Sequence, residues 1–172
     1  MNLPVGITAL RIIFVPLFTY LLYLSSSNSQ MAFWAGLLFL ILSLTDYLDG
    51  YLARKWSQVS NLGKFLDPLA DKVLILAALI VMVDLKMVAG GWVILVITRE
   101  MIVMGIRLMG SSQREVIAAS PLAKLKTVLQ MFGVGFLIMH WPYGLEIFYV
   151  SVMVALISMG EYVYINRHFL KG

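Results

Sequence analysis

Six long apolar runs follow one another along the chain, and short polar segments separate them. Each run is close to the roughly 20 residues that an α-helix needs to cross a bilayer. The runs cover residues 7–25, 31–55, 62–84, 88–110, 120–140 and 143–166. This pattern predicts an all-α integral membrane protein, with six transmembrane helices in a single domain of residues 1–172.

A short segment, residues 1–6, precedes the first apolar run. Pro4 favours the start of a helix or a turn over a helix interior, because its ring fixes φ and it has no backbone N–H. We therefore expect a short N-terminal segment that lies along the membrane interface.

Composition supports the prediction of a membrane protein. Hydrophobic residues make up 61% of the chain and the mean hydropathy is +0.91, whereas soluble domains contain about 45–50% apolar residues. These values exclude an ordinary soluble domain. In a soluble protein a net charge of +4 would suggest a nucleic-acid partner. In a membrane protein the positions of the charges indicate the topology instead, and we expect no nucleic-acid partner.

Lysine and arginine are unevenly distributed between the two ends of the predicted helices. In the segments that join the helices at one end of the bundle, Lys86 is the only Lys or Arg. The segments at the other end hold Arg54, Lys55, Lys64, Arg107, Arg114, Lys124, Lys126, Arg167 and Lys171. Because cytoplasmic segments carry the excess of Lys and Arg, both termini are predicted to be cytoplasmic, in a bacterial inner or plasma membrane.

Four of the nine acidic residues lie between residues 46 and 71, in otherwise apolar surroundings. Charge in a membrane segment is costly enough to indicate a function. Asp46 and Asp49 are spaced i, i+3, which places both on one face of a helix. Asp67 and Asp71, spaced i, i+4, share a face of the next helix. The polar residues 55–61 allow a turn between these helices, so the two acidic faces can meet near the cytoplasmic end.

Clustered carboxylates repel one another unless their pKa values rise or cations bind between them. The chain has no Cys, and His140 and His168 are both remote in sequence. The available ligands are hard oxygens, which suit Mg²⁺ or Mn²⁺ rather than zinc or copper. Two such ions about 3.5–4 Å apart can neutralise a diphosphate, and a nearby carboxylate can take the proton of an attacking alcohol.

Small residues and one arginine accompany the acids. Gly50, Ala53 and Gly63 leave space beside the carboxylates, where a ligand can approach closely. Arg54 offers a planar fork of donors that fits phosphate oxygens. Together with the acids, these residues predict a site for a diphosphate and metal ions.

The spacing of these eight residues resembles the signature of the CDP-alcohol phosphotransferase family. It reads Asp46-x2-Asp49-Gly50-x2-Ala53-Arg54-x8-Gly63-x3-Asp67-x3-Asp71. The resemblance implies an enzyme that transfers a substituted phosphate from a CDP-linked donor to an alcohol and releases CMP. It also implies a homodimer, and the six helices with both ends inside match the family's fold.

Residue roles follow by position from the same resemblance. The ligands of two Mg²⁺ or Mn²⁺ ions would be Asp46, Asp49, Asp67 and Asp71. Asp71 would also act as the general base. The CDP-lipid would be bound by Gly50, Ala53 and Gly63 beside the cytidine and by Arg54 beside the diphosphate.

A second set of cations lies in the fourth and fifth apolar runs. Arg107 is near the cytoplasmic end of its run, and Lys124 and Lys126 begin the next. These three side chains can form a pocket for an anionic head group. Alternatively, at least one lysine only anchors the topology, because residues two apart do not share a helical face.

Arg99 and Glu100 are charged residues inside the fourth apolar run. Because they are adjacent, their side chains are expected to face different directions, which weakens an ion pair between them. Either residue can instead pair with another helix. A structural role and a ligand role are both open for them.

Further residues are similar to the phosphatidylglycerophosphate synthase branch of the family. They are Asn2, Pro4, Thr8, Arg11, Thr98–Glu100, Arg107, Lys124–Thr127 and Gln130. That branch uses CDP-diacylglycerol and sn-glycerol 3-phosphate, and a phosphorylated acceptor would account for the three cations. Thr8, Arg11 and Arg114 are further candidates for substrate contacts, although Arg11 can also extend to the membrane interface. The chain departs from the branch pattern at Val5 and Ala123, which bear on the N-terminal contacts and the acceptor pocket.

Two alternatives remain open. The same chemistry with another acceptor would give a cardiolipin synthase acting on phosphatidylglycerol, or an enzyme for inositol phosphate or serine. A divalent-cation transporter would use the acids as a permeation site. The transporter hypothesis is weakened by the position of the acids, which lie near one end of their helices. The outer halves of these helices contain no second group of polar residues that could bind an ion on its way across.

Overall fold

The computed structural model describes residues 3–55, 61–112 and 120–167, and the side chains of residues 12–45, 72–110 and 120–167. These residues form six α-helices and no strand, which confirms the predicted all-α class. The helices are α1 (Leu3–Leu24), α2 (Ser29–Lys55), α3 (Asn61–Asp84), α4 (Gly90–Ser112), α5 (Pro121–Ile138) and α6 (Gly144–Ile165).

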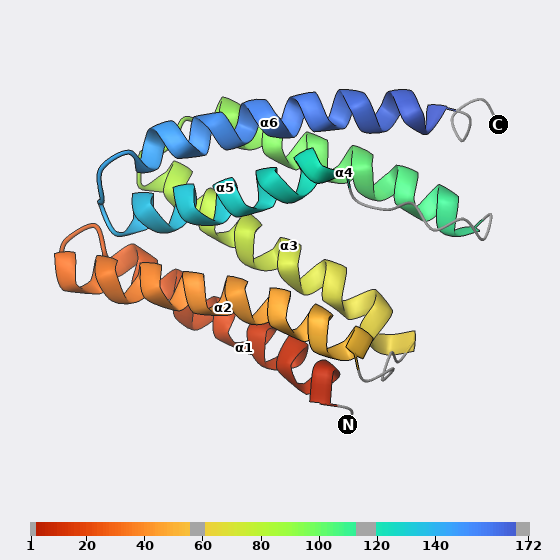
Figure 1. The fold of residues 1–172 in the computed structure, drawn as a ribbon. Helices are drawn as coiled ribbons and strands as arrows, with labels where there is room; N and C mark the ends of the chain where they lie inside the picture. Colours follow the sequence, from red (N-terminus) through yellow and green to blue (C-terminus); the bar gives the residue numbers. More distant parts are fainter. Residues whose placement is uncertain (1–2, 56–60, 113–119, 168–172) are drawn as a thin grey trace.

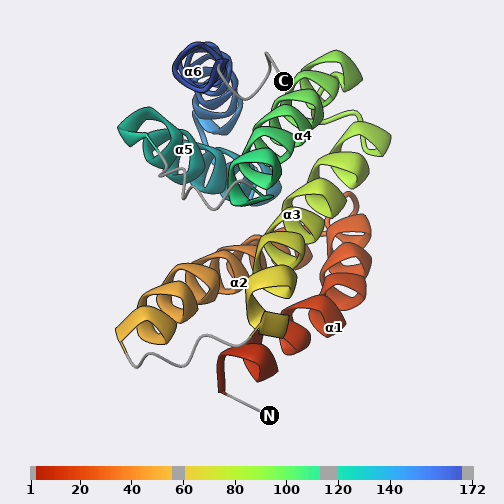
Figure 2. The ribbon, with the colours of Figure 1, turned by 90° about the vertical axis from the view of Figure 1, so that its right-hand side faces the viewer.

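Successive helices run in opposite directions along the bundle (Figure 1). α1, α2 and α3 form one half, and α4, α5 and α6 form the other, as the view along the bundle shows (Figure 2). α5 packs on α6 and contacts α2, while α4 contacts both α3 and α6. The start of α1 and the end of α6 lie at the same end of the bundle, together with the end of α2 and the start of α3.

The helix bounds agree with the predicted runs to within two residues, except at the N-terminus. α1 begins at Leu3, so residues 3–6 belong to the first helix and the prediction of a separate segment was wrong there, whereas its position at the membrane interface stays a prediction. Pro4 is the second residue of α1, in the turn whose N–H groups have no partner within the helix. Its missing N–H therefore removes no helical hydrogen bond, and the helix continues through it.

The start of α5 is determined by its local sequence. Ser120 is the N-cap, and its Oγ accepts a hydrogen bond of 3.3 Å from the backbone N–H of Ala123. Pro121 occupies the first helical position, where its fixed φ suits a helix. This start places Lys126 in the second turn of α5, on the face that is buried inside the bundle.

The core lies where the six helices meet, and all six contribute buried apolar side chains. The rings of Phe18 on α1 and Phe39 on α2 lie 5.7 Å apart between centroids. Among the described residues, the largest fully buried side chains include Phe18, Phe39, Phe148, Leu22, Leu79 and Met82. This packing ties the two halves of the bundle together.

Large apolar side chains also point outward from every helix. Examples are Ile13, Trp34, Ile80, Ile94, Val128 and Ile157. Within the described residues, α5 and α6 are long and apolar enough to cross a membrane, and shorter apolar stretches cover Ile12–Leu24 and Ser29–Thr45. An apolar exterior around an apolar core is typical of a membrane protein.

Glycines let α5 and α6 approach each other closely. A Cβ added at Gly133 would lie 2.7 Å from the backbone nitrogen of Phe148, and one added at Gly144 would lie 2.7 Å from that of Leu137. Both obstacles are backbone atoms, which cannot move aside as a flexible side chain can. The two helices therefore touch through their backbones, in the small-residue packing common in membranes.

We expect the variant Gly133→Ala to lower stability in detergent. Its methyl group must push α6 away from α5, and overpacking of this kind costs about 1–3 kcal/mol. Gly160→Ala is the matched control, because a Cβ there has no atom within 4 Å, and alanine favours a helix interior by about 0.5–1 kcal/mol. Thermal unfolding of both variants measures the difference; equal midpoints would contradict the close approach.

Candidate active site

The acid-bearing segments form the end of α2 and the start of α3. Asp46 and Asp49 belong to α2, and Asp67 and Asp71 belong to α3. The backbone is helical at all four positions, so the spacing of each pair places it on one helix face as predicted. Both segments lie at the same end of the bundle (Figure 1).

The side chains of the eight signature residues lie outside the side chains that the structure describes. Within the described residues, no group of three or more His, Asp or Glu side chains is arranged to hold a metal ion. The four aspartates of the signature are the metal ligands that the family resemblance implies. Their chemistry fits Mg²⁺ or Mn²⁺, because two helices supply carboxylate oxygens and the chain contains no Cys.

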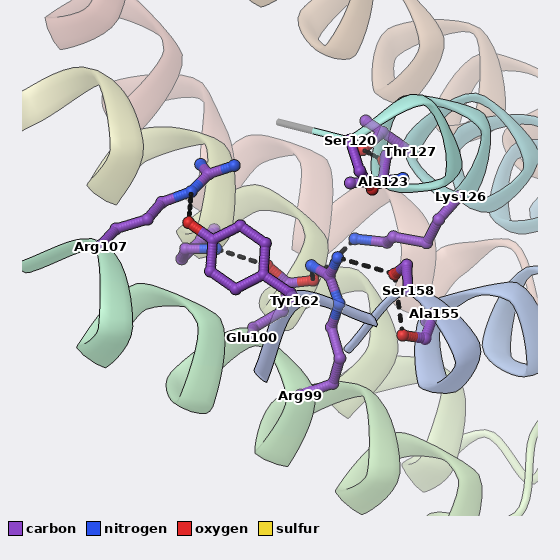
Figure 3. Close-up of polar contacts among 11 residues, drawn as sticks. Arg99, Glu100, Arg107, Ser120, Ala123, Lys126, Thr127, Ala155, Ser158 and Tyr162 are labelled. Atoms are coloured by element: carbon purple, nitrogen blue, oxygen red, sulfur yellow. Dashed lines mark hydrogen bonds and ion pairs between the residues drawn. The ribbon is translucent and has the colours of Figure 1, made fainter. Parts of the chain in front are cut away.

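A buried carboxylate on α4 forms the centre of the described polar residues. Glu100 is 7% exposed and accepts hydrogen bonds from three cations on three helices. Lys126 of α5 donates to Oε1 at 2.7 Å, and Arg99 of α4 donates to the same oxygen at 2.7 Å. Lys72 of α3 donates to Oε2. In Figure 3 the ends of the Arg99, Glu100 and Lys126 side chains point toward one another.

The direct pair between Arg99 and Glu100 corrects the expectation that their adjacency weakens it. Both side chains are long enough to turn from neighbouring positions toward a common point, where Nη1 and Oε1 lie 2.7 Å apart. The expectation that either residue can pair with another helix is confirmed. Arg99 also donates from Nη2 to the Oγ of Ser158 on α6 at 3.1 Å.

The cluster around Glu100 carries more positive than negative charge. Among the described side chains, three cations (Lys72, Arg99 and Lys126) contact one carboxylate, so the formal charge of these four groups is three minus one, or plus two. Arg99 and Lys126 are each only 6% exposed, and burial makes uncompensated charge costly. In addition, the Nε of Arg99 is buried without a hydrogen-bond partner in the described part of the chain. The cluster therefore favours a neighbouring anion.

Arg107 lies farther along α4, and Tyr162 of α6 holds its side chain. The Nε of Arg107 donates to the hydroxyl of Tyr162 at 3.3 Å. The guanidinium carbon lies 5.8 Å from the centroid of the same ring. Figure 3 draws this pair together with the Glu100 cluster. The Arg107 side chain is otherwise exposed, so it keeps donors for a ligand.

The structure separates the two lysines of the predicted acceptor pocket. Lys126 is buried against Glu100, whereas Lys124 is exposed. This agrees with the expectation that residues two apart do not share a helical face. Of the further candidates, Thr8 and Arg11 belong to α1 but their side chains are outside the described ones, and Arg114 lies outside the described residues altogether.

Sequence reasoning did not single out three residues that contact this network: Lys72, Ser158 and Tyr162. Lys72 carries a signal that could have found it, because it is a charged residue at the edge of an apolar run and directly follows Asp71. Ser158 and Tyr162 carry no such signal. Serine and tyrosine are common in membrane helices, and only tertiary contact distinguishes these two.

Comparison with known proteins identifies the family of the chain. The sequence pattern of the CDP-alcohol phosphatidyltransferase family matches residues 1–160. The chain belongs to this family. The match includes the whole signature from Asp46 to Asp71 and every described residue of the Glu100 cluster, which lies within α3 to α6. The resemblance inferred from the signature is confirmed, and so is the prediction of an enzyme.

Three bacterial proteins are similar to this chain over nearly its full length. A protein of Bacillus subtilis (strain 168) is 39% identical over an alignment of 188 residues. The alignment covers 99% of this chain and 97% of the relative. A protein of Haemophilus influenzae is 36% identical, covering 96% and 94%, and one of Escherichia coli (strain K12) is 34% identical, covering 94% and 93%. Each is named CDP-diacylglycerol–glycerol-3-phosphate 3-phosphatidyltransferase.

We expect Ser158→Ala to destabilise the fold more than Ser151→Ala does. Both serines are buried on α6, and each donates to the backbone carbonyl three residues earlier. Only Ser158 also accepts from Arg99, so its loss leaves a buried guanidinium donor unpaired at about 1–3 kcal/mol. Thermal unfolding in detergent compares the two variants, and equal shifts would show that the Arg99 contact contributes nothing to stability.

Proposed function

We propose that the protein transfers the phosphatidyl group of CDP-diacylglycerol to sn-glycerol 3-phosphate, giving phosphatidylglycerophosphate and CMP. The observation that carries this proposal is the similarity, over nearly the whole chain, to relatives named for this reaction. The signature supports the CDP-linked donor, and the excess positive charge around Glu100 supports an acceptor with a phosphate group.

In the proposed reaction, a hydroxyl oxygen of the acceptor attacks the phosphorus that carries the diacylglycerol. A new P–O bond forms there, and the bond from this phosphorus to the bridging oxygen of the diphosphate breaks. CMP leaves with that oxygen. Asp71 takes the proton of the attacking hydroxyl as general base.

The signature residues have separate roles in binding the donor. Two Mg²⁺ or Mn²⁺ ions, when bound, neutralise charge on the diphosphate, and their proposed ligands are Asp46, Asp49, Asp67 and Asp71. Gly50, Ala53 and Gly63 leave room for the cytidine. Arg54 donates to the diphosphate oxygens, which its planar fork fits.

Arg107, Lys124 and Lys126 bind the acceptor phosphate in this proposal. A phosphate monoester carries a charge of about −1.5 to −2 near neutral pH. That charge would offset the excess of plus two around Glu100, which supports Lys126 as the inner contact. Arg107 and the exposed Lys124 would guide the anion from the mouth of the site. Thr8, Arg11 and Arg114 remain further candidates for substrate contacts.

We also propose that all six helices span the membrane with both termini in the cytoplasm. The support is the antiparallel order of the helices, which brings the start of α1 and the end of α6 to one end of the bundle (Figure 1). The cations Arg107, Lys124 and Arg167 belong to segments near that end, and Lys86 to a turn at the other. The active site would then face the cytoplasm of a bacterium and draw its donor from the surrounding lipid. A homodimer, which the family resemblance implies, is part of the same proposal.

The proposed reaction is tested by CMP release from detergent-purified protein supplied with CDP-diacylglycerol and Mg²⁺. We expect release only when sn-glycerol 3-phosphate is added, and none after chelation of the metal. Asp71→Asn is the control for catalysis, because it is nearly isosteric and lacks the basic carboxylate; we expect it to bind CDP-lipid without turnover.

Other results of this assay would correct the proposal in defined ways. Release only with phosphatidylglycerol, inositol phosphate or serine would keep the signature chemistry and reject the acceptor. No release with any acceptor would reject the phosphatidyltransferase reaction. Metal uptake into sealed vesicles in the absence of CDP-lipid would then favour a divalent-cation transporter.

The acceptor pocket is tested by Lys126→Gln and Lys124→Gln measured separately. We expect Lys126→Gln to raise KM for sn-glycerol 3-phosphate about tenfold or more, since a hydrogen bond to a charged group is worth about 1.5–3 kcal/mol. The exposed Lys124 is expected to have a smaller effect. KM for CDP-diacylglycerol provides the internal control, and an equal rise for both substrates would indicate general damage to the protein.

A further inference from the structure

Glu100 occupies a position that none of the proposed substrate contacts explains. Its carboxylate is buried and anionic, so it does not attract a phosphate. Yet it accepts hydrogen bonds from α3, from its own helix α4 and from α5. A carboxylate at the centre of three cations controls where those cations lie.

The two oxygens of Glu100 have different partners. Oε1 accepts from Lys126 and Arg99, each at 2.7 Å, whereas Oε2 accepts from Lys72. Arg99 is itself held by Ser158 of α6 at 3.1 Å. This second contact limits the movement of Arg99, and with it the movement of the Glu100 carboxylate.

Lys126 depends on Glu100 to stay in the bundle. Its ammonium group ends a flexible four-carbon chain, and the cations Arg99 and Lys72, which share its carboxylate, both repel it. Without the negative charge of Glu100, the Lys126 side chain would turn away from these cations. The carboxylate therefore holds an amine in a place that it would otherwise leave.

Lys126 keeps donors for a ligand while it is held. An ammonium group has three N–H donors, and its contacts with the described residues use one of them, toward Oε1 of Glu100. The others are free to bind phosphate oxygens. Lys72 adds a second link, because it directly follows Asp71 on α3, so Glu100 also joins the helix of the general base to the helix of the phosphate contact.

We propose that Glu100 is a positioning residue that holds the Lys126 ammonium against the acceptor phosphate and fixes it relative to α3. This inference rests on the proposed function, since it takes Lys126 as a contact to sn-glycerol 3-phosphate. Glu100 itself touches no substrate. It acts through Lys126, and its contribution is specific to the acceptor.

The test uses the full-length variants Glu100→Gln and Glu100→Asp, with initial rates of CMP release measured as each substrate is varied. Glutamine keeps the shape of Glu100 and removes its charge, so we expect KM for sn-glycerol 3-phosphate to rise about tenfold, with little change for CDP-diacylglycerol. Aspartate keeps the charge but is one methylene shorter, so its KM should lie between those of the wild type and Glu100→Gln. Glu146→Gln, at an exposed position at the start of α6, is the control and should behave as the wild type.

The same variants in a Lys126→Gln background separate positioning from general stability. If Glu100 acts through Lys126, Glu100→Gln should raise KM for the acceptor much less once Lys126 is already removed. A purely structural role would instead lower kcat and thermal stability alike in both backgrounds. That result, or an unchanged KM for the acceptor in Glu100→Gln, would overturn the proposal.

Two outcomes distinguish this inference from the proposed function on which it rests. A normal acceptor KM in Lys126→Gln would reject the acceptor pocket itself. A raised KM in Lys126→Gln with a normal KM in Glu100→Gln would reject only the positioning role. If Glu100→Gln fails to fold, Glu100→Asp decides alone: a raised acceptor KM supports the role, and an unchanged one overturns it.

Discussion

A carboxylate buried among apolar helices stays ionised only where cations and hydrogen-bond donors surround it. Glu100 meets this requirement by drawing Lys72 from α3 and Lys126 from α5, with Arg99 beside it on α4. Arg99 in turn reaches Ser158 on α6. Four of the six helices therefore meet at one charged point. Apolar contacts alone barely distinguish one membrane helix from another. The charged cluster therefore helps to determine which helices pack together, which the surrounding leucines and valines cannot do.

The packing of α5 explains how a lysine comes to lie in the bundle interior. Lys126, Gln130 and Gly133 are spaced i, i+4, i+7 and share the buried face of the helix. Gly133 brings the backbone of α6 within contact distance at one end of this face. Lys126 lies at the other end of the face, where the ion pair with Glu100 compensates its charge. Close helix packing and the charged cluster are thus two parts of one helix face.

The arrangement also suggests how one enzyme of this family can bind two anionic substrates without mixing their sites. The acids of α2 and α3 suit a diphosphate only together with metal ions, whereas the cations near Glu100 suit a phosphate directly. Lys72 and Asp71 are consecutive residues of α3, so the two proposed sites would adjoin along one helix. In the proposed reaction, this proximity would bring the acceptor hydroxyl toward the donor phosphorus.

The amino-acid sequence alone determined the all-α class, five of the six helices to within two residues at each end, and the family, because apolar runs and the spacing from Asp46 to Asp71 are local patterns. It placed the start of the first helix at residue 7, whereas α1 begins at Leu3, because a proline in the first turn of a helix and one in a segment before it look alike in sequence. It also underestimated the Arg99–Glu100 pair. The tertiary structure decided that Lys126 is buried while Lys124 is exposed, and that Ser158 supports Arg99. Those outcomes depend on which helices pack together and on how far flexible charged side chains reach, and neither can be inferred from spacing along one chain.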